Sequence, residues 1–167
     1  PRAVKESYQL ATNHFKGVLT SIVEELDKLR TPISSTTLSL KGSVSKRMMN
    51  AVLPFADQFV TPMASVAGAV ADEICDVMSN VRDLKKIYVN DGGDIALYVA
   101  SGEVLSVGLV PSVKIKQVKS KIDILPHMNV KGIPTSGMHG RSISLRIADA
   151  GTVLAHSSAS ADAAATL

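Results

Sequence analysis

Apolar side chains recur every three or four residues in two long segments of the chain, and this spacing predicts two amphipathic helices. The first covers residues 11–30 and ends before Pro32, because proline disfavours helical geometry in the residue that precedes it. The second covers residues 61–80, with Thr61 as its expected N-cap and Pro62 at its first helical position. This second helix is the clearest element of the sequence.

The sides of the second helix differ in charge and in size. Three acidic residues are expected to face water: Asp72, Glu73 and Asp76. Gly68 lies on a thin side among alanines, which predicts that another backbone approaches closely there. Cys75 has apolar neighbours and no adjacent Lys or Arg, so we expect a buried, unreactive thiol.

Shorter patterns complete the expected fold. Ser45 is the expected N-cap of a helix that runs to residue 51 or 53, and a last helix begins near residue 158 or 160. Apolar runs bounded by turn residues predict strands at 38–40, 86–89, 95–100, 104–110, 113–125, 142–147 and 152–155. We therefore expect one α/β (α+β) domain over residues 1–167, with a mixed or antiparallel sheet packed with helices. Because the chain stops inside a predicted helix, we expect truncation at the C-terminus.

Composition narrows the classes of function. Apolar residues make up 46% of the 167 residues, enough for one core, but aromatic residues make up only 4% and the net charge is a mild +3. The low aromatic content and the mild net charge both argue against a nucleic-acid-binding surface. Cys75 is the only cysteine, which excludes an internal disulfide and a Cys₄ or Cys₂His₂ zinc site and favours a reducing cytoplasm. No apolar run reaches the roughly 18 residues of a membrane helix, so we expect no membrane partner.

The first candidate for ligand binding lies between two predicted strands. Gly92 and Gly93 can adopt positive φ and allow a ligand close to the backbone, and Asn90 and Asp94 flank them. The same residue types are those that β-turns usually contain. The segment is therefore either a ligand-binding strand end or an ordinary turn.

The second candidate is the loop expected over residues 132–140, with the residues that follow it. Thr135 and Ser136 offer hydroxyl groups, Gly137 leaves backbone N–H groups accessible, and His139 and Arg141 add further donors. Such donors suit the anion half of a site for a phosphorylated ligand. The alternative is an ordinary surface loop.

The third candidate is a cation site on the last helix. Asp162 and Thr166 are four residues apart, which places a carboxylate and a hydroxyl on one helical stripe among alanines. Oxygen ligands suit Mg²⁺, and with so few side chains the ion would need waters, a backbone carbonyl or ligand phosphates as well. We expect this stripe to face the sheet. The alternative is a tightly packed helix in which Asp162 only complements the N-terminal helix dipole.

The order of these segments resembles a known group of proteins. The resemblance rests on residues 61–72 (TPMASVAGAVAD), 90–95 (NDGGDI), 135–137 (TSG), 148–155 (ADAGTVLA) and 161–166 (ADAAAT). Together they are similar to an uncharacterised prokaryotic family related to the ApbE-like flavin transferases, once called thiamine-biosynthesis lipoproteins. The resemblance covers residues 61–167 and implies an ApbE-like fold of the T-fold type.

The flavin transferases bind FAD and Mg²⁺ and move FMN onto a threonine of a target protein. The resemblance therefore implies flavin binding by the NDGGDI segment and metal binding by Asp162, Thr166 and the carbonyl of Val66. Two departures affect the chemistry. Ala67 replaces the lysine of the transferase Ala-Lys-Gly element, and the His-x-x-Asp-Pro-x-Thr-Gly stretch is missing. We also expect no signal peptide and no lipid-attachment cysteine.

Three functions follow from these observations. The first is an enzyme or cofactor-binding domain that acts on a flavin or similar nucleotide with Mg²⁺, with FMN transfer as its candidate activity. The second is a non-catalytic nucleotide- or anion-binding or sensing protein that kept the site and lost the chemistry. The third is a structural interaction module whose last helix only packs. The sequence leaves open the substrate, any target protein and whether the chain forms a homo-oligomer.

Overall fold

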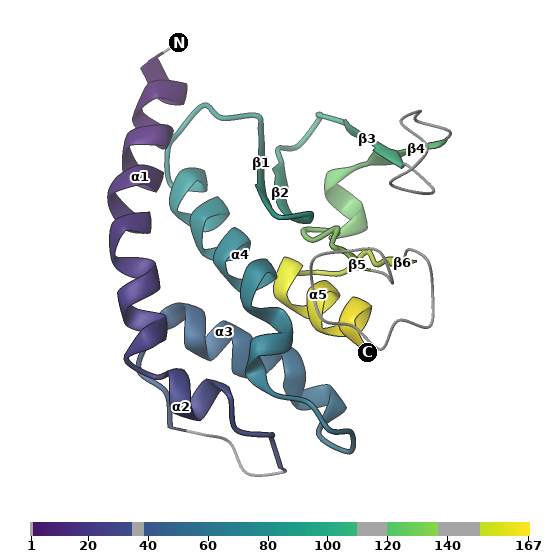
Figure 1. Ribbon diagram of the computed structural model, residues 1–167. Helices are drawn as coiled ribbons and strands as arrows, with labels where there is room; N and C mark the ends of the chain where they lie inside the picture. Colours follow the sequence, from purple (N-terminus) through teal and green to yellow (C-terminus); the bar gives the residue numbers. More distant parts are fainter. Residues whose placement is uncertain (1, 35–38, 110–119, 137–150) are drawn as a thin grey trace.

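Helix α4 (Val66–Ser79) lies at the centre of the fold, between α1 (Arg2–Val23) and α5 (Ser158–Thr166) (Figure 1). Helix α3 (Ser43–Val52) contacts all three of these helices. The computed structural model describes residues 2–34, 39–109, 120–136 and 151–167, which form one α+β domain. None of the helices in these ranges is both long and apolar enough to cross a membrane.

The first predicted helix is present, but its bounds differ from 11–30. Helix α1 begins at Arg2 and ends at Val23, and a short helix α2 (Leu26–Leu29) follows a break. Glu25, at this break, is 9% exposed and accepts hydrogen bonds from the backbone N–H groups of Lys41 (2.7 Å) and Gly42 (2.9 Å). Its carboxylate therefore satisfies the backbone that leads into the next helix rather than facing water.

Of the two expected N-caps, Thr61 occupies the N-cap position of the turn before α4, whereas Ser45 does not cap α3. Helix α3 begins at Ser43, after Gly42, so Ser45 lies inside the helix and does not cap it. Pro62 opens a short 3₁₀ turn, η2 (Pro62–Ser65), which leads into α4, as its position predicts. Thr61 precedes this turn but makes no capping hydrogen bond through its side chain.

The described strands pair as three antiparallel ladders. Strand β1 (Lys86–Asp91) pairs with β2 (Asp94–Val99), β3 (Leu105–Leu109) with β4 (Ser120–Ile124), and β5 (Thr135–Ser136) with β6 (Gly151–Thr152). Gly132 forms isolated bridges to Ala96 and Ala155 and so links the first ladder to the third. The result is a layer in which β2 neighbours residues 131–136, and these in turn neighbour residues 151–155.

Most predicted strands that can be compared are found near their expected positions. The strands at 86–89, 95–100 and 104–110 correspond to β1, β2 and β3, and the end of the 113–125 segment corresponds to β4. Residues 39 and 40 are not in a strand, and β6 is shorter than the expected 152–155. The strand at 142–147 lies outside the described residues. The T-fold type of architecture stays a prediction.

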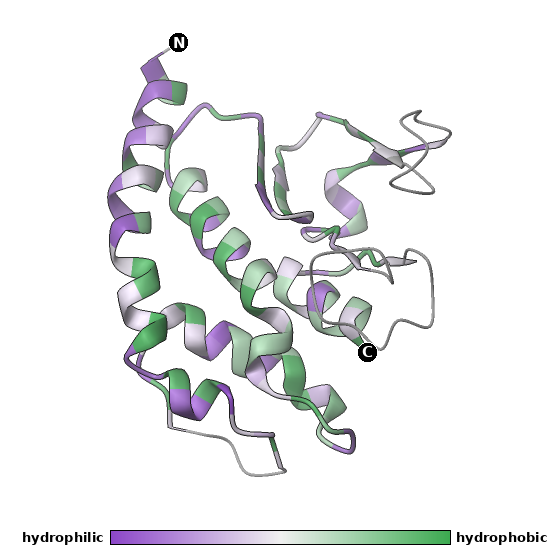
Figure 2. Cartoon of the chain, viewed as in Figure 1, coloured by the Kyte–Doolittle hydropathy of each residue, from purple (hydrophilic) through white to green (hydrophobic). Residues whose placement is uncertain are grey.

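The β1–β2 hairpin separates two apolar clusters. Ile87 and Ala96 belong to the main core with α1, α3, α4 and α5, whereas Leu97 packs on the other side with Ile124 and Ile133. Figure 2 shows that α4 is hydrophobic along most of its length, as expected of a helix enclosed by others. Cys75 is buried there as predicted, and burial, with Asp76 and Asp72 nearby, raises the pKa of its thiol to about 12.

Candidate functional site

Helices α4 and α5 form an antiparallel pair with contacts at regular four-residue intervals. Three pairs of residues define this register: Asp72 with Ser158, Gly68 with Asp162, and Ala64 with Thr166. Asp162 and Thr166 therefore share one stripe of α5, as their spacing predicts. Both side chains form their hydrogen bonds with α4 and the turn before it, and Asp162 also interacts electrostatically with Asp94 at the start of β2.

Asp72 closes the N-terminal end of α5. Its Oδ1 accepts a hydrogen bond from the Ser158 N–H and its Oδ2 accepts one from the Ala159 N–H, both at 2.8 Å. Asp72 is only 7% exposed, so its predicted position on the solvent side of the helix is wrong. Burial raises the pKa of Asp72, although the two N–H groups act in the opposite direction. These two N–H groups are therefore not free to bind an anionic ligand.

Glu73 is also buried rather than exposed. It accepts hydrogen bonds from the Ser43 hydroxyl (2.7 Å) and Arg47 Nε (2.9 Å), and its Oε1 lies 3.0 Å from His14 Nε2. Burial works to raise the pKa of Glu73, but these three partners outweigh it and the net pKa is lowered. The network joins α1, α3 and α4 and leaves only Asp76 of the three predicted solvent-facing acids exposed.

Two glycines let the α5 end come close to its neighbours. A Cβ atom at Gly68 would collide with the backbone of Ser158 and Ala159, which confirms the predicted close approach. A Cβ atom at Gly132 would collide with the backbone of Ser157 and Ser158 from the other side. The start of α5 is therefore held between α4 and the strand layer, with no room for a side chain at either glycine.

Asp162 is buried at the first turn of α4. It is 5% exposed, and its Oδ2 accepts a hydrogen bond from the Gly68 N–H at 3.0 Å. Burial, and next the carboxylate of Asp94, raise the pKa of Asp162 to about 7, although the Gly68 N–H acts against this shift. Asp94 is 8% exposed, and burial together with Asp91 raises its pKa to about 6.

Within the described ranges, no Lys, Arg or His forms an ion pair with Asp94 or Asp162. The pKa of each of these two carboxyl groups is moved towards neutrality mainly by burial, and the charge of Asp94 adds to the shift at Asp162. Such a pair is stable only if it keeps a proton or gains a cation. This is the main electrostatic feature of the site.

The segment with two glycines forms a hairpin turn, and its predicted contact with a ligand stays a prediction. Gly92 (φ +67°) and Gly93 (φ +123°) connect β1 to β2, and Asn90 Oδ1 accepts a hydrogen bond from the Gly93 N–H at 2.9 Å. A Cβ atom at Gly93 would lie 3.8 Å from the Thr135 carbonyl oxygen. The turn therefore lies next to β5, and Asp94, which follows it, interacts electrostatically with Asp162.

The predicted hydroxyl loop is partly a strand. Thr135 Oγ1 lies 2.9 Å from Thr152 Oγ1 on the exposed side of the β5–β6 pair. Ser136 is buried, and its hydroxyl has no hydrogen-bond partner among the residues that the structure describes. Gly137, His139 and Arg141 lie outside the described residues, so their predicted role in anion binding stays a prediction.

Thr166 lies one helical turn beyond Asp162 on α5, and Val66 is the first residue of α4. The Thr166 hydroxyl donates a hydrogen bond to the Ala64 carbonyl at 3.3 Å, two residues before Val66 opens α4. No group of three or more His, Cys, Asp or Glu side chains within the described residues could hold a metal ion. A cation at this pair would therefore need hydroxyl or carbonyl oxygens, waters or a ligand in addition to the carboxylates.

Two features of the site could not be anticipated from local sequence. The capping of α5 by Asp72 joins residues 86 positions apart, and the burial of Asp94 depends on how the hairpin turn meets α5. Gly132 was predicted as the first residue of the loop over residues 132–140, but its close approach to Ser157 and Ser158 could not be predicted from the sequence.

These features define an α+β domain with a reciprocally capped helix pair beside a glycine turn and a buried pair of carboxyl groups. The whole chain, residues 1–167, matches the family described as AbpE bacteria, and the protein belongs to this family.

Curated archaeal relatives extend this result. The chain is 39% identical over 108 residues to the UPF0280 protein MJ1526 of Methanocaldococcus jannaschii, a match that covers 64% of the chain and 43% of the relative. It is 34% identical over 125 residues to a UPF0280 protein of Archaeoglobus fulgidus (75% of the chain, 48% of the relative). It is 38% identical over 125 residues to a UPF0280 protein of Methanothrix thermoacetophila (74% and 49%). The chain thus spans about half the length of the curated relatives that it matches.

Proposed function

We propose that this protein binds a phosphorylated small molecule or nucleotide together with Mg²⁺ at the α4–α5 pair, with FAD and FMN as the first ligands to test. The observation that carries the proposal is the buried pair of Asp94 and Asp162, which has no cationic partner within the described residues. A divalent cation would relieve the repulsion between the two carboxylates and would attract the phosphate oxygens of a ligand.

The chemistry of the surrounding groups suits a hard cation. The Gly68 N–H binds one oxygen of Asp162, which leaves the other oxygen as an acceptor, and the buried hydroxyl of Ser136 has no partner in the described part of the chain. The groups that could bind the metal are all oxygen atoms, which Mg²⁺ prefers. They are too few to enclose the ion without a bound ligand. Thr166 and the carbonyl of Val66 are the further metal-binding groups that the resemblance implies. We therefore expect metal and nucleotide to strengthen each other's binding.

Flavin binding is the finer part of the proposal and rests on the resemblance to the ApbE-like flavin transferases. The hairpin turn with Asn90, Gly92 and Gly93 would approach the ligand through its backbone, and the segment from Thr135 to Arg141 would supply donors for the phosphates. FMN transfer to a target protein is the activity to test first. The alternative is a non-catalytic binding or sensing protein, which is favoured by Ala67 in place of the transferase lysine.

A thermal-shift experiment tests the binding step. Wild type is heated with FAD, FMN or ATP, each with and without Mg²⁺, beside Asp162→Asn and the exposed control Asp57→Asn. We expect stabilisation that requires both nucleotide and Mg²⁺ in wild type and Asp57→Asn and that is lost in Asp162→Asn. If no nucleotide stabilises wild type, or if Asp162→Asn responds as wild type does, the proposal is wrong and α5 has only a packing role.

Release of AMP from FAD separates the two versions of the function. FMN transfer breaks the pyrophosphate bond of FAD, so AMP must accumulate together with a flavin-labelled protein. Chromatography of the nucleotides after incubation of the protein with FAD, Mg²⁺ and a threonine-containing acceptor protein measures this product. AMP release that depends on Asp162 supports the transferase, whereas metal-dependent FAD binding without AMP release supports the non-catalytic protein.

A further inference from the structure

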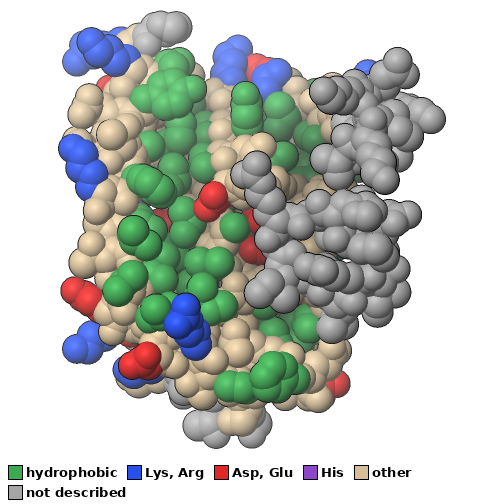
Figure 3. All heavy atoms as spheres, in the orientation of Figure 1, with side chains coloured by type: hydrophobic (Ala, Val, Ile, Leu, Met, Phe, Trp, Pro, Cys, Tyr) green, Lys and Arg blue, Asp and Glu red, His purple; other side chains and the backbone are tan. Residues whose placement is uncertain are grey.

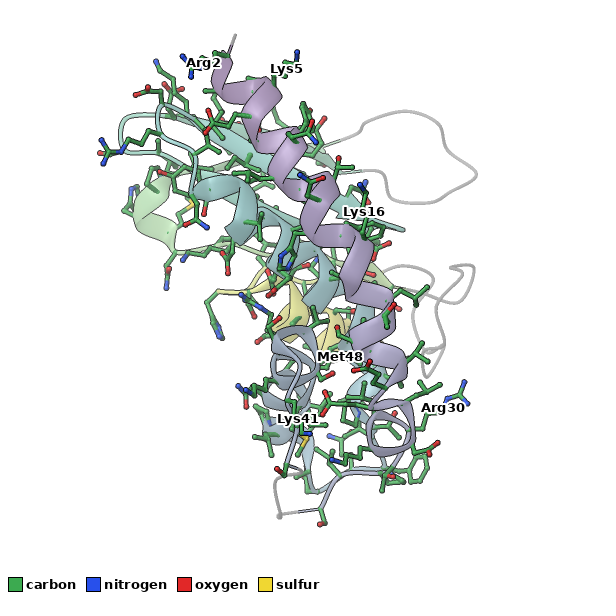
Figure 4. All side chains as sticks on the ribbon, turned by 90° about the vertical axis from the view of Figure 1, so that its left-hand side faces the viewer. Arg2, Lys5, Lys16, Arg30, Lys41 and Met48 are labelled. Atoms are coloured by element: carbon green, nitrogen blue, oxygen red, sulfur yellow. The ribbon has the colours of Figure 1, made fainter. Side chains whose placement is uncertain are left out.

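Helix α5 carries no large side chain that could fix its position on α4. Its nine residues, SASADAAAT, are Ser, Ala, Asp and Thr only. Large side chains interlock as ridges and grooves, whereas a surface of alanines is smooth. Helix α5 is nevertheless in contact with α3, α4 and β5, and Figure 4 shows it directly above α3, near the labelled Met48. Polar contacts must therefore set how far α5 slides along α4 and how it rotates.

Asp72 supplies the strongest of these polar contacts. Its two oxygens accept two N–H groups of the first turn of α5, both at 2.8 Å. Asp162 accepts only one N–H group, from Gly68, at 3.0 Å. The remaining contact of the helix pair is a hydroxyl–carbonyl hydrogen bond of 3.3 Å. Hydrogen bonds to a carboxylate are roughly twice as strong as neutral ones, so we expect Asp72 to dominate the register of α5.

The strand layer meets α5 at the same turn. A Cβ atom at Gly132 would collide with the backbone at the start of α5, so the two backbones are in contact there. Gly132 also forms a bridge to Ala96, which lies in β2, the strand that begins at Asp94. The start of α5 therefore links the strand that carries Asp94 to the helix that carries Asp162.

A small movement of α5 would separate the two carboxyl groups. Asp162 lies four residues after Ser158, about 6 Å along the helix axis, so it moves with the first turn. A rotation of α5 by one residue, about 100°, would turn Asp162 away from both Gly68 and Asp94. Figure 3 shows acidic side chains at the surface near the middle of this face, in the region where α4, α5 and the β1–β2 turn meet in Figure 1. The geometry of the site thus depends on how these three elements are held together.

We propose that Asp72 is a positioning residue of the cation site, because by holding the first turn of α5 it places Asp162 against Gly68 and beside Asp94. The inference rests on the proposed function for the cation itself. Both oxygens of Asp72 accept N–H groups, so Asp72 is not a ligand of the cation. Loss of its contact should weaken cation binding from one helical turn away.

An effect of the Asp72 charge alone makes a different prediction. This charge also acts on Asp162, so a substitution that removes it could change cation binding without moving α5. Two variants separate these explanations. Asp72→Asn removes the charge and leaves one acceptor oxygen for two N–H groups. Gly132→Ala keeps the charge and displaces the start of α5 through the added Cβ atom.

Amide exchange at Gly68 reports the position of Asp162 without any ligand. The Gly68 N–H lies in the first turn of α4, where N–H groups lack a partner within the helix, and Asp162 accepts it instead. The exchange rate is measured relative to that of Ile74 in the interior of α4. We expect this ratio to rise at least about tenfold in both Asp72→Asn and Gly132→Ala.

Two variants on α1 control for a general loss of stability. Gly17→Ala adds a Cβ atom that meets nothing within 4 Å, and Ile22→Ala truncates a buried core residue. Both should keep the wild-type exchange ratio. All four variants are then titrated with Mg²⁺ at constant FAD in a calorimeter. We expect at least about tenfold weaker Mg²⁺ binding in Asp72→Asn and Gly132→Ala, and binding within about twofold of wild type in the two controls.

The proposal is overturned if Gly68 exchanges at the wild-type ratio in both Asp72→Asn and Gly132→Ala. It is also overturned if only Asp72→Asn weakens Mg²⁺ binding, because the charge and not the position of α5 would then be responsible. Failure of wild type to bind Mg²⁺ with FAD would contradict the proposed function instead. The exchange of Gly68 would then still decide whether Asp72 positions Asp162.

Discussion

The two ends of the α4–α5 pair use the same residue type in opposite ways. At one end Asp72 accepts two N–H groups from the start of α5, both at 2.8 Å, so both of its oxygens are bound. At the other end Asp162 accepts one N–H, from Gly68, and interacts with the buried carboxyl of Asp94. The two carboxyl groups are similarly buried, but both oxygens of Asp72 accept hydrogen bonds, whereas one oxygen of Asp162 can still accept a further contact. Only the second arrangement favours a cation.

Loss of the Asp72 carboxylate should have the largest effect on stability. Asp72→Ala removes two hydrogen bonds to a buried carboxylate and leaves the N–H groups of Ser158 and Ala159 without partners. We expect the free energy of unfolding to fall by about 2–4 kcal/mol. Urea unfolding followed by circular dichroism measures it. A change below about 1 kcal/mol would show that this end is not the structural contact described above.

Gly68→Ala comes next. A single Cβ atom there would collide with the backbone of Ser158 and Ala159, so the two helices must separate. We expect a loss of about 1–3 kcal/mol in unfolding free energy from overpacking. Gly17→Ala is the matched control, because a Cβ atom at that helical glycine meets nothing within 4 Å. Equal melting temperatures for Gly68→Ala and wild type would contradict the close approach.

The charge of Asp162 should make stability depend on pH. Its pKa in the folded protein is about 7, above the ordinary value of 3.8, so the folded chain keeps a proton that the unfolded chain releases. Without metal, stability should therefore fall as pH rises from about 4 to 7. Asp162→Asn keeps an oxygen acceptor for the Gly68 N–H and removes the charge. We expect this variant to be more stable than wild type at pH 8 by about 1–3 kcal/mol, and the pH dependence to be reduced.

Unfolding curves at pH 5 and pH 8 in the presence of a chelator make this measurement. A variant that is less stable than wild type at both pH values would mean that the carboxylate of Asp162 stabilises the fold as Asp72 does. The contrast between the two ends of the helix pair would then be wrong.

Thr166 should have the smallest effect. Its hydroxyl donates one hydrogen bond, of 3.3 Å, to the Ala64 carbonyl at a half-buried position. Thr166→Val keeps the shape of the side chain, and we expect it to cost about 0.5–1.5 kcal/mol without metal. If Thr166 also binds Mg²⁺, the same variant should weaken metal-dependent nucleotide binding by a larger factor, which calorimetry would detect.

Local patterns were sufficient for the elements that local chemistry specifies. The central helix, its Pro62 turn, the glycine hairpin and the i,i+4 stripe of α5 all follow from spacing and turn residues. The positions of buried charges did not follow, because they depend on contacts between distant segments. Asp72 looked like a solvent-facing acid and is held by residues 158 and 159. Ser45 looked like a cap, but Glu25 already satisfies the backbone before α3.

The most direct test of the proposed site is urea unfolding at pH 8 while Mg²⁺ is titrated at a constant concentration of FAD. Without Mg²⁺ we expect Asp162→Asn to be more stable than wild type. As the Mg²⁺ concentration rises, wild type should gain stability, by about 2.7 kcal/mol when the free ligand concentration is a hundred times its dissociation constant. The variant should gain none, so wild type should become the more stable of the two proteins. Parallel curves for the two proteins, with no crossing at any Mg²⁺ concentration, would contradict a cation at Asp162.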